Sequence, residues 1–191
     1  WDFQRNTMAT MEAEQAIIVL KARRLGLSWV VLAFALWLAI FNQGIRILVL
    51  CKTGDDASEL LDRIRRMKER MEADPASRHL FHNLKPGAKT RDAVTTLDIG
   101  SSTIRALMGT PAAARSETAG FVILDEFAFQ RGSPEIWRAI WPTIEGGGKL
   151  AVVSTGNGAA KGGTIGAEFA RLWSDAKRGV TPLSPLFFPW M

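Results

Sequence analysis

Tyrosine is absent from this sequence of 191 residues, and cysteine and histidine are scarce. Because Cys51 is the only cysteine, no disulfide bond can form within the chain, and this favours a reducing compartment. His79 and His82 are the only histidines, and no cysteine or second group of metal ligands lies near them in the sequence. We therefore expect no zinc site of the usual cysteine and histidine kind.

A hydrophobic run long enough to cross a membrane is also missing. The longest apolar run covers residues 27–41 and stops at Asn42 and Gln43, whereas a spanning helix needs about 20 apolar residues. A signal peptide is not expected either, because the run follows a strand pattern and has no small-residue cleavage site. A helix that is apolar on nearly every face is typical of the buried central helix of an α/β domain.

Composition places the chain among folded proteins with one domain of ordinary size. Hydrophobic residues make up 47% and charged residues 23% of the sequence, which is typical of a globular protein. The chain has 24 Lys and Arg against 19 Asp and Glu, a formal net charge of +5. A charge of this size permits a polyanionic partner but does not require one.

Short apolar runs alternate with helical patterns along the chain. We expect strands at residues 17–20, 45–51, 121–124 and 150–153, and a β-hairpin that joins 94–99 to 103–108. We expect helices at 27–41, 55–73, 133–141 and 165–177, and a short helix that ends near residue 16. We expect irregular segments at 74–91 and 111–120, and residues 181–191, which are rich in proline and aromatic residues, would begin a further segment. This order predicts an α/β fold of three layers, with a mainly parallel central sheet and an added β-hairpin.

Polar residues directly follow three of the expected strands. Lys21 follows the first strand, Asp125 and Glu126 follow the strand at 121–124, and Ser154 and Thr155 follow the strand at 150–153. In a parallel α/β sheet, ligands bind at the carboxyl ends of the strands. The three strand ends are therefore expected to line one site.

The segment from residue 21 to residue 28 is a strand–loop–helix connection of the kind that binds phosphates at a helix N-terminus. In the usual pattern G-x-x-x-x-G-K-[ST], Gly26 and Ser28 take the second glycine and the serine positions. Leu27 stands in the place of the lysine, and Lys21 stands in the place of the first glycine. Lys21 and Arg24 can supply the missing charge, because a lysine at the start of the loop can fold back over the β- and γ-phosphates.

The remaining strand-end residues have the chemistry that nucleotide hydrolysis requires. Asp125 and the hydroxyl of Ser28 are oxygen ligands of the kind that Mg²⁺ prefers. Glu126 can orient or deprotonate the attacking water. The Ser154-Thr155 pair suits a sensor of the γ-phosphate, and Arg115, in a segment of small residues, is a candidate arginine finger.

In this order, the motifs resemble those of the N-terminal packaging ATPase of the large terminase subunit of tailed bacteriophages, over essentially the whole chain. Residues 21–28 resemble the family's deviant Walker A motif, whose lysine commonly lies at the start of the loop. Residues 121–129 resemble its Walker B motif. Residues 154–157 resemble its coupling motif, although the family often has proline where Gly156 stands.

The resemblance implies roles for further residues. Gln4, in Phe3-Gln4-Arg5, is similar to the glutamine that reads the adenine base, and Arg115 matches the arginine finger that acts on the next subunit. The implied catalytic residues are Lys21, Arg115 and Glu126, and the implied metal ligands are Ser28 and Asp125. The implied nucleotide contacts are Gln4, Lys21, Arg23, Arg24, Leu25, Gly26, Leu27, Ser28, Asp125, Ser154 and Thr155.

The resemblance also implies a P-loop fold of the RecA/ASCE kind and a function. The chain would bind ATP and Mg²⁺ and use hydrolysis to translocate double-stranded DNA into a procapsid in the host cytoplasm. Its expected partners are DNA, the portal protein, the small terminase subunit and further copies in a ring, with a monomer in isolation and no membrane. Residues 1–180 would form the ATPase domain and 181–191 the start of a lid or linker. The family's nuclease domain is absent from this chain, so DNA cleavage is not expected.

Two other functions fit parts of the sequence. A superfamily 2 helicase core also has a DE-x-A motif and a motif with Ser-Thr, but no second RecA-like half is present in this chain. A DNA- or procapsid-binding adaptor without hydrolysis is the other alternative, and Leu27 in the lysine position supports it. Which of Lys21, Arg23 and Arg24 contacts the phosphates is left open by the sequence.

Overall fold

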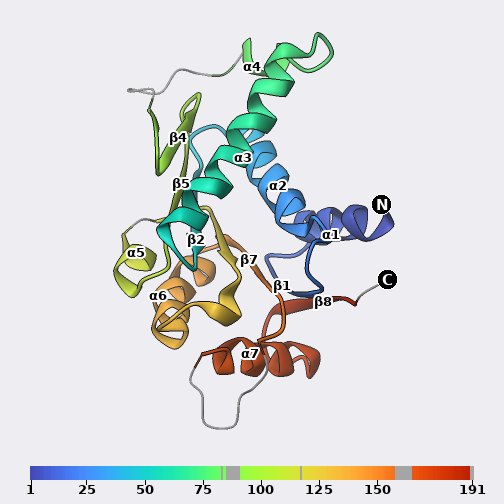
Figure 1. Ribbon diagram of the computed structural model, residues 1–191, viewed down its shortest axis with the longest axis vertical. Coiled ribbons are helices and arrows are strands. Elements are labelled where there is room, and N and C mark those ends of the chain that lie inside the picture. Colours follow the sequence, from blue (N-terminus) through green and yellow to red (C-terminus); the bar gives the residue numbers. More distant parts are fainter. Residues whose placement is uncertain (83, 85–90, 117, 158–164, 190–191) are drawn as a thin grey trace.

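A single mixed sheet forms the middle layer of the molecule (Figure 1). The computed structural model describes residues 1–82, 84, 91–116, 118–157 and 165–189. Within them the strand order is β3-β4-β5-β2-β6-β7-β1-β8. The strands are β1 (Ala16–Lys21), β2 (Arg46–Cys51), β3 (Asp92–Ala93), β4 (Thr96–Ile99), β5 (Ser102–Met108), β6 (Phe121–Asp125), β7 (Lys149–Ser154) and β8 (Leu183–Phe188).

The part of the sheet that carries the expected site is parallel. Strand β7 lies between β1 and β6 and pairs with both in the parallel sense, and β2 continues the parallel sheet beyond β6. The three strand ends that the sequence predicted to meet therefore belong to neighbouring strands. At the far edge, β4 and β5 form the predicted antiparallel hairpin. The predicted α/β fold with a mainly parallel sheet and an added hairpin is confirmed.

Helices cover both faces of the sheet. One face carries the first three helices and the other carries the helices that follow β5, β6 and β7 (Figure 1). The helices are α1 (Asp2–Ala13), α2 (Leu27–Phe41), α3 (Gly54–Ala73), α4 (His79–His82), α5 (Pro111–Arg115), α6 (Ser133–Glu145) and α7 (Ala167–Lys177), with a short 3-10 helix η1 (Phe127–Phe129).

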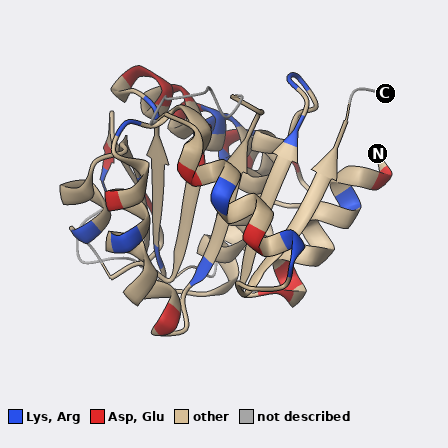
Figure 2. Cartoon of the chain, turned by 90° about the horizontal axis from the view of Figure 1, so that it is seen from below, with Lys and Arg blue, Asp and Glu red and all other residues tan. Residues whose placement is uncertain are grey.

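The alternation of side chains along each strand divides the apolar core into two halves. On β1, Ile17 and Val19 belong to the half of the core that contains the buried side chains of α2 and α3, whereas Ile18 belongs to the half that contains those of α6 and α7. Successive strand residues point to opposite faces, so a strand covered on both sides must be apolar at every position. Charged residues accordingly lie on the helices and loops, while the strands are mostly uncharged (Figure 2).

Helix α2 is the buried central helix that its apolar sequence predicted. Its residues from Leu27 to Ile40 contribute more buried side chains than any other described helix. Among the described residues, no helix is both long enough and apolar enough to cross a membrane.

Several expected boundaries were wrong. The N-terminal helix begins at Asp2 and ends at Ala13, because Phe3, Thr7 and Met11 lie on one face at helical spacing and pack inward. Helix α6 continues through Pro142 to Glu145. The carbonyl that loses its donor there belongs to the exposed residue Arg138, while Ile144 is buried.

Two segments expected to be irregular contain regular structure, and so does the proline-rich segment 181–191. Helix α5 forms after Thr110, whose hydroxyl accepts the Ala113 N–H at 3.0 Å, and Pro111 takes the first helical turn. The short helix α4 lies within 74–91. Strand β8 lies within 181–191 and pairs along one side with β1, so Pro185 stands on an edge strand, where a missing N–H is tolerated.

Leu27 gives a test of this core. Its side chain is 1% exposed, so Leu27→Lys, which restores the lysine position of the usual phosphate-loop pattern, puts an unpaired charge into the core. We expect this substitution to lower the free energy of unfolding by about 3–5 kcal/mol, measured by urea denaturation. The control Leu27→Met keeps the volume and should cost less than about 1.5 kcal/mol. A lysine variant as stable as the unmodified chain would show that residue 27 does not belong to the core.

Candidate functional site

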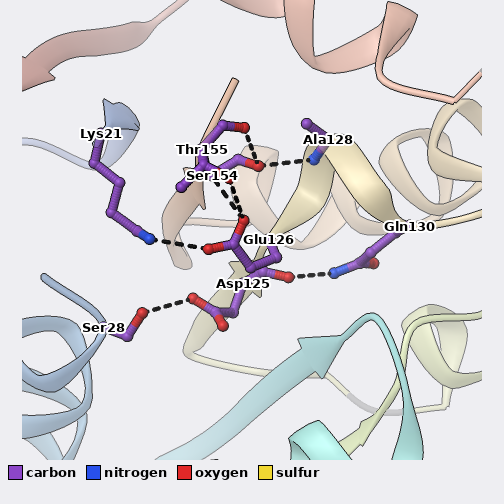
Figure 3. Close-up of polar contacts among 8 residues, drawn as sticks. All are labelled: Lys21, Ser28, Asp125, Glu126, Ala128, Gln130, Ser154 and Thr155. Atoms are coloured by element: carbon purple, nitrogen blue, oxygen red, sulfur yellow. Dashed lines mark hydrogen bonds and ion pairs between the residues drawn. The ribbon is translucent and has the colours of Figure 1, made fainter. Parts of the chain in front are cut away.

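The ends of β1, β6 and β7 bring their polar residues into contact at one edge of the sheet (Figure 3). Lys21 Nζ lies 2.9 Å from Glu126 Oε1, and the pair spans the intervening strand β7. The other carboxylate oxygen, Oε2, accepts hydrogen bonds from the backbone N–H and the hydroxyl of Thr155 at 3.2 and 3.0 Å. Both oxygens of Glu126 are therefore held from different strands.

A second contact links the start of α2 to the end of β6. The Ser28 hydroxyl donates to Asp125 Oδ1 at 3.0 Å. Ser28 lies in the first turn of α2, two residues after the N-cap Gly26, whose φ of 73° is left-handed and suits glycine. The loop thus places one hydroxyl beside one carboxylate, and the role of these two residues as metal ligands stays a prediction.

The two neighbouring carboxyl groups have opposite pKa shifts. Burial raises the pKa of Asp125 to about 6, and the charge of Glu126 adds to this effect, while Lys21 and the Ser28 hydrogen bond act against it. Burial alone would raise the pKa of Glu126, but the charge of Lys21 and the hydrogen bonds from Lys21 and Thr155 outweigh it and hold this pKa below its usual range. Glu126 therefore stays ionised to a lower pH than Asp125.

The backbone around Glu126 is constrained from several directions. Glu126 has φ 47° and ψ 44°, a left-handed conformation that L residues other than glycine rarely adopt. The Ser154 hydroxyl accepts the Ala128 N–H at 3.1 Å and donates to the Thr155 carbonyl at 2.9 Å. Asn157 donates to the Ala128 carbonyl at 2.9 Å. The turn after β6 is thus tied to the end of β7.

A cavity of about 360 Å³ opens above these residues. Seven of the residues predicted for the site line it, namely Lys21, Arg23, Arg24, Ser28, Asp125, Glu126 and Thr155. Within the described part of the chain, neither Arg23 nor Arg24 forms an ion pair. The cavity therefore contains two cationic side chains without a carboxylate partner among the described residues, while Asp56, Glu59, Asp125 and Glu126 also line it.

The other predicted residues lie outside the cavity lining. Gln4 of α1 lies against the loop, since a Cβ at Gly26 would be 3.3 Å from its Nε2. Leu25 and Leu27 pack into the core. Ser154 is fully buried and bonded to the turn after β6, so a direct nucleotide contact of its side chain stays a prediction.

Arg115 lies apart from the other predicted residues. It lines a separate hollow between α5 and α6, together with Arg138 and Thr143. This position agrees with a role towards another subunit, and that role stays a prediction.

Sequence reasoning missed several other residues of the cavity lining. Among them are Lys52, Asp56, Glu59, Arg63 and Phe129. The Lys52 ammonium lies 6.0 Å from the centre of the Phe129 ring, and Arg63 pairs with Glu59 and lies over the Trp29 ring. Lys52 directly follows β2, so the rule that pointed to Lys21 and Asp125 would also have found it.

No family model matches the sequence, but solved structures are similar to it. The large terminase of a thermophilic bacteriophage aligns with a TM-score of 0.66 at 13% identity, over 97% of this chain and 44% of that one. The ATPase domain of the Thermus phage P74-26 large terminase aligns with a TM-score of 0.62 at 18% identity, over 95% of this chain and 79% of that one. The fold is that of phage large terminase ATPase domains.

A third similar structure is the large terminase of bacteriophage HK97, with a TM-score of 0.66 at 16% identity, over 98% of this chain and 38% of that one. This chain therefore spans less than half the length of the HK97 protein and of the first terminase above. That first terminase, from the thermophilic bacteriophage, has also been solved in complexes with ADP and with ATP-γ-S. The resemblance found from the motifs is confirmed at the level of the fold.

Asp125 gives a prediction about pH. Because its pKa rises from 3.8 to about 6 on folding, the folded chain binds an extra proton between about pH 4 and 6, and stability falls as pH rises through this range. In metal-free buffer at pH 8, Asp125→Asn should raise the free energy of unfolding by on the order of 2–3 kcal/mol. The amide oxygen can still accept from Ser28. Near pH 4 the two proteins should be equally stable in urea denaturation.

Asp98 is the control, because its pKa is shifted in the opposite direction to that of Asp125. It is buried, and hydrogen bonds from Arg91 and Thr103 outweigh the effect of burial and lower its pKa. Asp98→Asn should therefore destabilise the chain at pH 8. If Asp125→Asn also destabilised it at this pH, the Asp125 carboxylate would be stabilised by its surroundings and the assignment above would be wrong.

Proposed function

We propose that this chain is the ATPase motor domain of a viral DNA-packaging terminase, which hydrolyses Mg-ATP and couples hydrolysis to translocation of double-stranded DNA into a procapsid. One observation carries the proposal. Lys21, Ser28, Asp125 and Glu126 meet in one cavity of a chain with the terminase ATPase fold. We extend to this chain the nucleotide binding that the ADP and ATP-γ-S complexes of the thermophilic bacteriophage's terminase represent.

The charge of the cavity supports a polyphosphate ligand. Lys21, Arg23, Arg24 and Lys52 line it from two sides. Arg24 has φ 64° and Gly26 has φ 73°, and a loop with such left-handed residues can turn backbone N–H groups towards an anion. Together with the N-terminus of α2, these groups would bind the phosphates through both charge and hydrogen bonds.

The Ser28 and Asp125 pair fits a magnesium ion held jointly by protein and nucleotide. A hydroxyl and a carboxylate oxygen 3.0 Å apart are hard ligands that can share one cation. Among the described residues, no cluster of three or more His, Cys, Asp or Glu could hold a metal alone. This agrees with an ion that takes its other ligands from phosphates and water. When bound, Mg²⁺ would neutralise charge on the phosphate oxygens.

Glu126 is the group that would accept the proton of the attacking water. Its low pKa keeps it ionised, and Thr155 fixes one of its oxygens. Lys21 occupies the other oxygen, so a phosphate that attracts Lys21 would free this oxygen for water. The release of Glu126 from Lys21 would be passed to the turn after β6 through Thr155 and Ser154. Thr155 is hydrogen-bonded to Glu126, and Ser154 is hydrogen-bonded to Ala128.

The same contacts bear on the adaptor alternative. Leu27 suggested a degenerate loop, but its side chain belongs to the core, and Lys21 reaches the catalytic carboxylate from the start of the loop. We therefore favour an active enzyme over an adaptor without hydrolysis. The portal protein, the small terminase subunit, a ring of copies and the host cytoplasm belong to this proposal, as does the division into residues 1–180 and 181–191.

Substitution of Glu126 tests the hydrolysis step. Glu126→Gln should lower kcat by about 10²–10⁴-fold, because the general base is lost, while ATP binding stays within about threefold. Phosphate release over a range of protein concentrations measures the first quantity, and nucleotide-dependent thermal stabilisation measures the second. Lys21→Met should weaken both, and the exposed control Glu135→Gln should change neither. Normal turnover in the Glu126 variant would show that Glu126 is not the general base.

Mixing of inactive variants tests Arg115. If Arg115 completes the site of a neighbouring subunit, Arg115→Ala should lower turnover by about 10³-fold, and mixing it with Glu126→Gln should restore part of the activity. The restored sites combine an intact Glu126 with an intact Arg115 from the other variant. Arg138→Ala is the matched control, because Arg138 lines the same hollow. A role in trans would be contradicted if the mixture regained no activity under conditions where the unmodified chain assembles and hydrolyses ATP.

A further inference from the structure

Gln130 is a buried polar residue that the mechanism above does not use. It follows η1 and is 1% exposed. Its Nε2 donates to the Leu50 carbonyl and to the Asp125 carbonyl, both at 2.9 Å, and Figure 3 shows the bond to Asp125. Since both partners are acceptors, the amide orientation is fixed and both hydrogens are used. One side chain thus joins the ends of β2 and β6, just beyond the pairing of Leu50 with Leu124.

The hydrogen bond from Gln130 to the Asp125 carbonyl restricts the backbone conformation that orients the Glu126 side chain. The Asp125 carbonyl belongs to the peptide unit that joins the two acidic residues, and this unit is planar. Holding its oxygen therefore limits the rotation that sets φ of Glu126, whose value of 47° is left-handed. The Gln130 amide is thus one of the contacts that keep the Glu126 carboxylate aimed at the cavity.

The other end of the same amide touches the segment that leads to Arg115. A Cβ at Gly109 would lie 2.2 Å from Gln130 Oε1, so glycine is required there by the close approach of the two residues. The Gly109 N–H donates to the Cys51 carbonyl at 2.7 Å, and the next residue, Thr110, caps α5. Helix α5 ends at Arg115.

Packing alone does not account for a glutamine in this place. Within the described residues, Gln130 Oε1 is buried without a hydrogen-bond partner. A buried acceptor without a partner is unfavourable, and an apolar side chain of similar length would avoid it. The two donated hydrogen bonds are therefore what the amide contributes.

We propose that Gln130 is a positioning residue for ATP hydrolysis, whose amide fixes the Asp125–Glu126 peptide and sets it against the Gly109 loop that begins the Arg115 helix. This inference rests on the proposed function for its effect on turnover. The structural part of the inference is that the Gln130 amide orders the segments 109–116 and 125–130. This part applies to the nucleotide-free chain as well.

Gln130→Met tests the proposal because it keeps the length and removes both donors. We expect kcat to fall by about 10-fold or more, with KM for ATP and nucleotide affinity within about threefold, since a misaimed carboxylate slows chemistry and leaves binding intact. In the nucleotide-free chain, amide hydrogen exchange measured by mass spectrometry should accelerate in peptides covering 109–116 and 125–130. Exchange in β1 should stay unchanged.

Gln15→Met is the matched control. The Gln15 amide also donates to two backbone carbonyls, those of Ile144 at 2.6 Å and Gly148 at 3.2 Å, but at the opposite end of the sheet. It should leave kcat and exchange in both segments unchanged. A second variant, Gly109→Ala, displaces the Gln130 amide from the other side and should reproduce the loss of kcat. Its control is Gly54→Ala, where an added Cβ meets nothing within 4 Å.

The outcomes separate the inference from the function on which it rests. Turnover and exchange like those of the unmodified chain in both Gln130→Met and Gly109→Ala would overturn the inference. A rise in KM that matches the fall in kcat/KM, with kcat unchanged, would also overturn it. If Gln130→Met does not fold, Gly109→Ala decides by the same criteria. If the unmodified chain neither binds nor hydrolyses ATP, the proposed function fails, and hydrogen exchange still decides whether Gln130 orders the two segments.

Discussion

The ion pair between Lys21 and Glu126 is the interaction on which the rest of the site depends. It spans β7 and joins the ends of two strands that do not pair with each other. Lys21 is 8% exposed, so the loss of Glu126 would leave the lysine charge with little water around it, which is strongly unfavourable. Lys21 also opposes the repulsion between Glu126 and Asp125. Two adjacent carboxyl groups can therefore occupy this edge because one lysine comes from the neighbouring loop.

The position of that lysine has a consequence for the phosphate loop. In the usual pattern the lysine stands directly before the serine that opens the helix, and its side chain must leave the core to reach the phosphates. Here Leu27 takes that place and is buried. Helix α2 is therefore anchored in the core from its first residue, while the charge comes from the strand end. The loop between them contains Arg24 and Gly26 in left-handed conformations.

Local sequence was sufficient for the sheet and for half of the site. Runs such as Phe121–Leu124 are apolar because both faces are covered, and the strand-end rule correctly predicted that Lys21, Asp125 and Thr155 would line one cavity. Arg63 could not be found in this way, because it lies in the middle of α3 and reaches the cavity only through the packing of that helix on the sheet. Helix α6 also extends beyond its predicted end, because the burial of Ile144 outweighs the cost of the hydrogen bond that Pro142 removes.

The sheet order has a consequence for how the chain is made. Strand β1 pairs with β7 and β8 only, and Ala16 faces Leu150 and Leu183. At about 5–20 residues per second, a ribosome needs on the order of 10 s to pass from β1 to β7. During that time an almost wholly apolar strand has no partner in its own sheet, and such long-range parallel pairing is slow. The strand that carries Lys21 is thus synthesised early and paired late, so the loop that follows it can take its shape only after most of the sheet has formed.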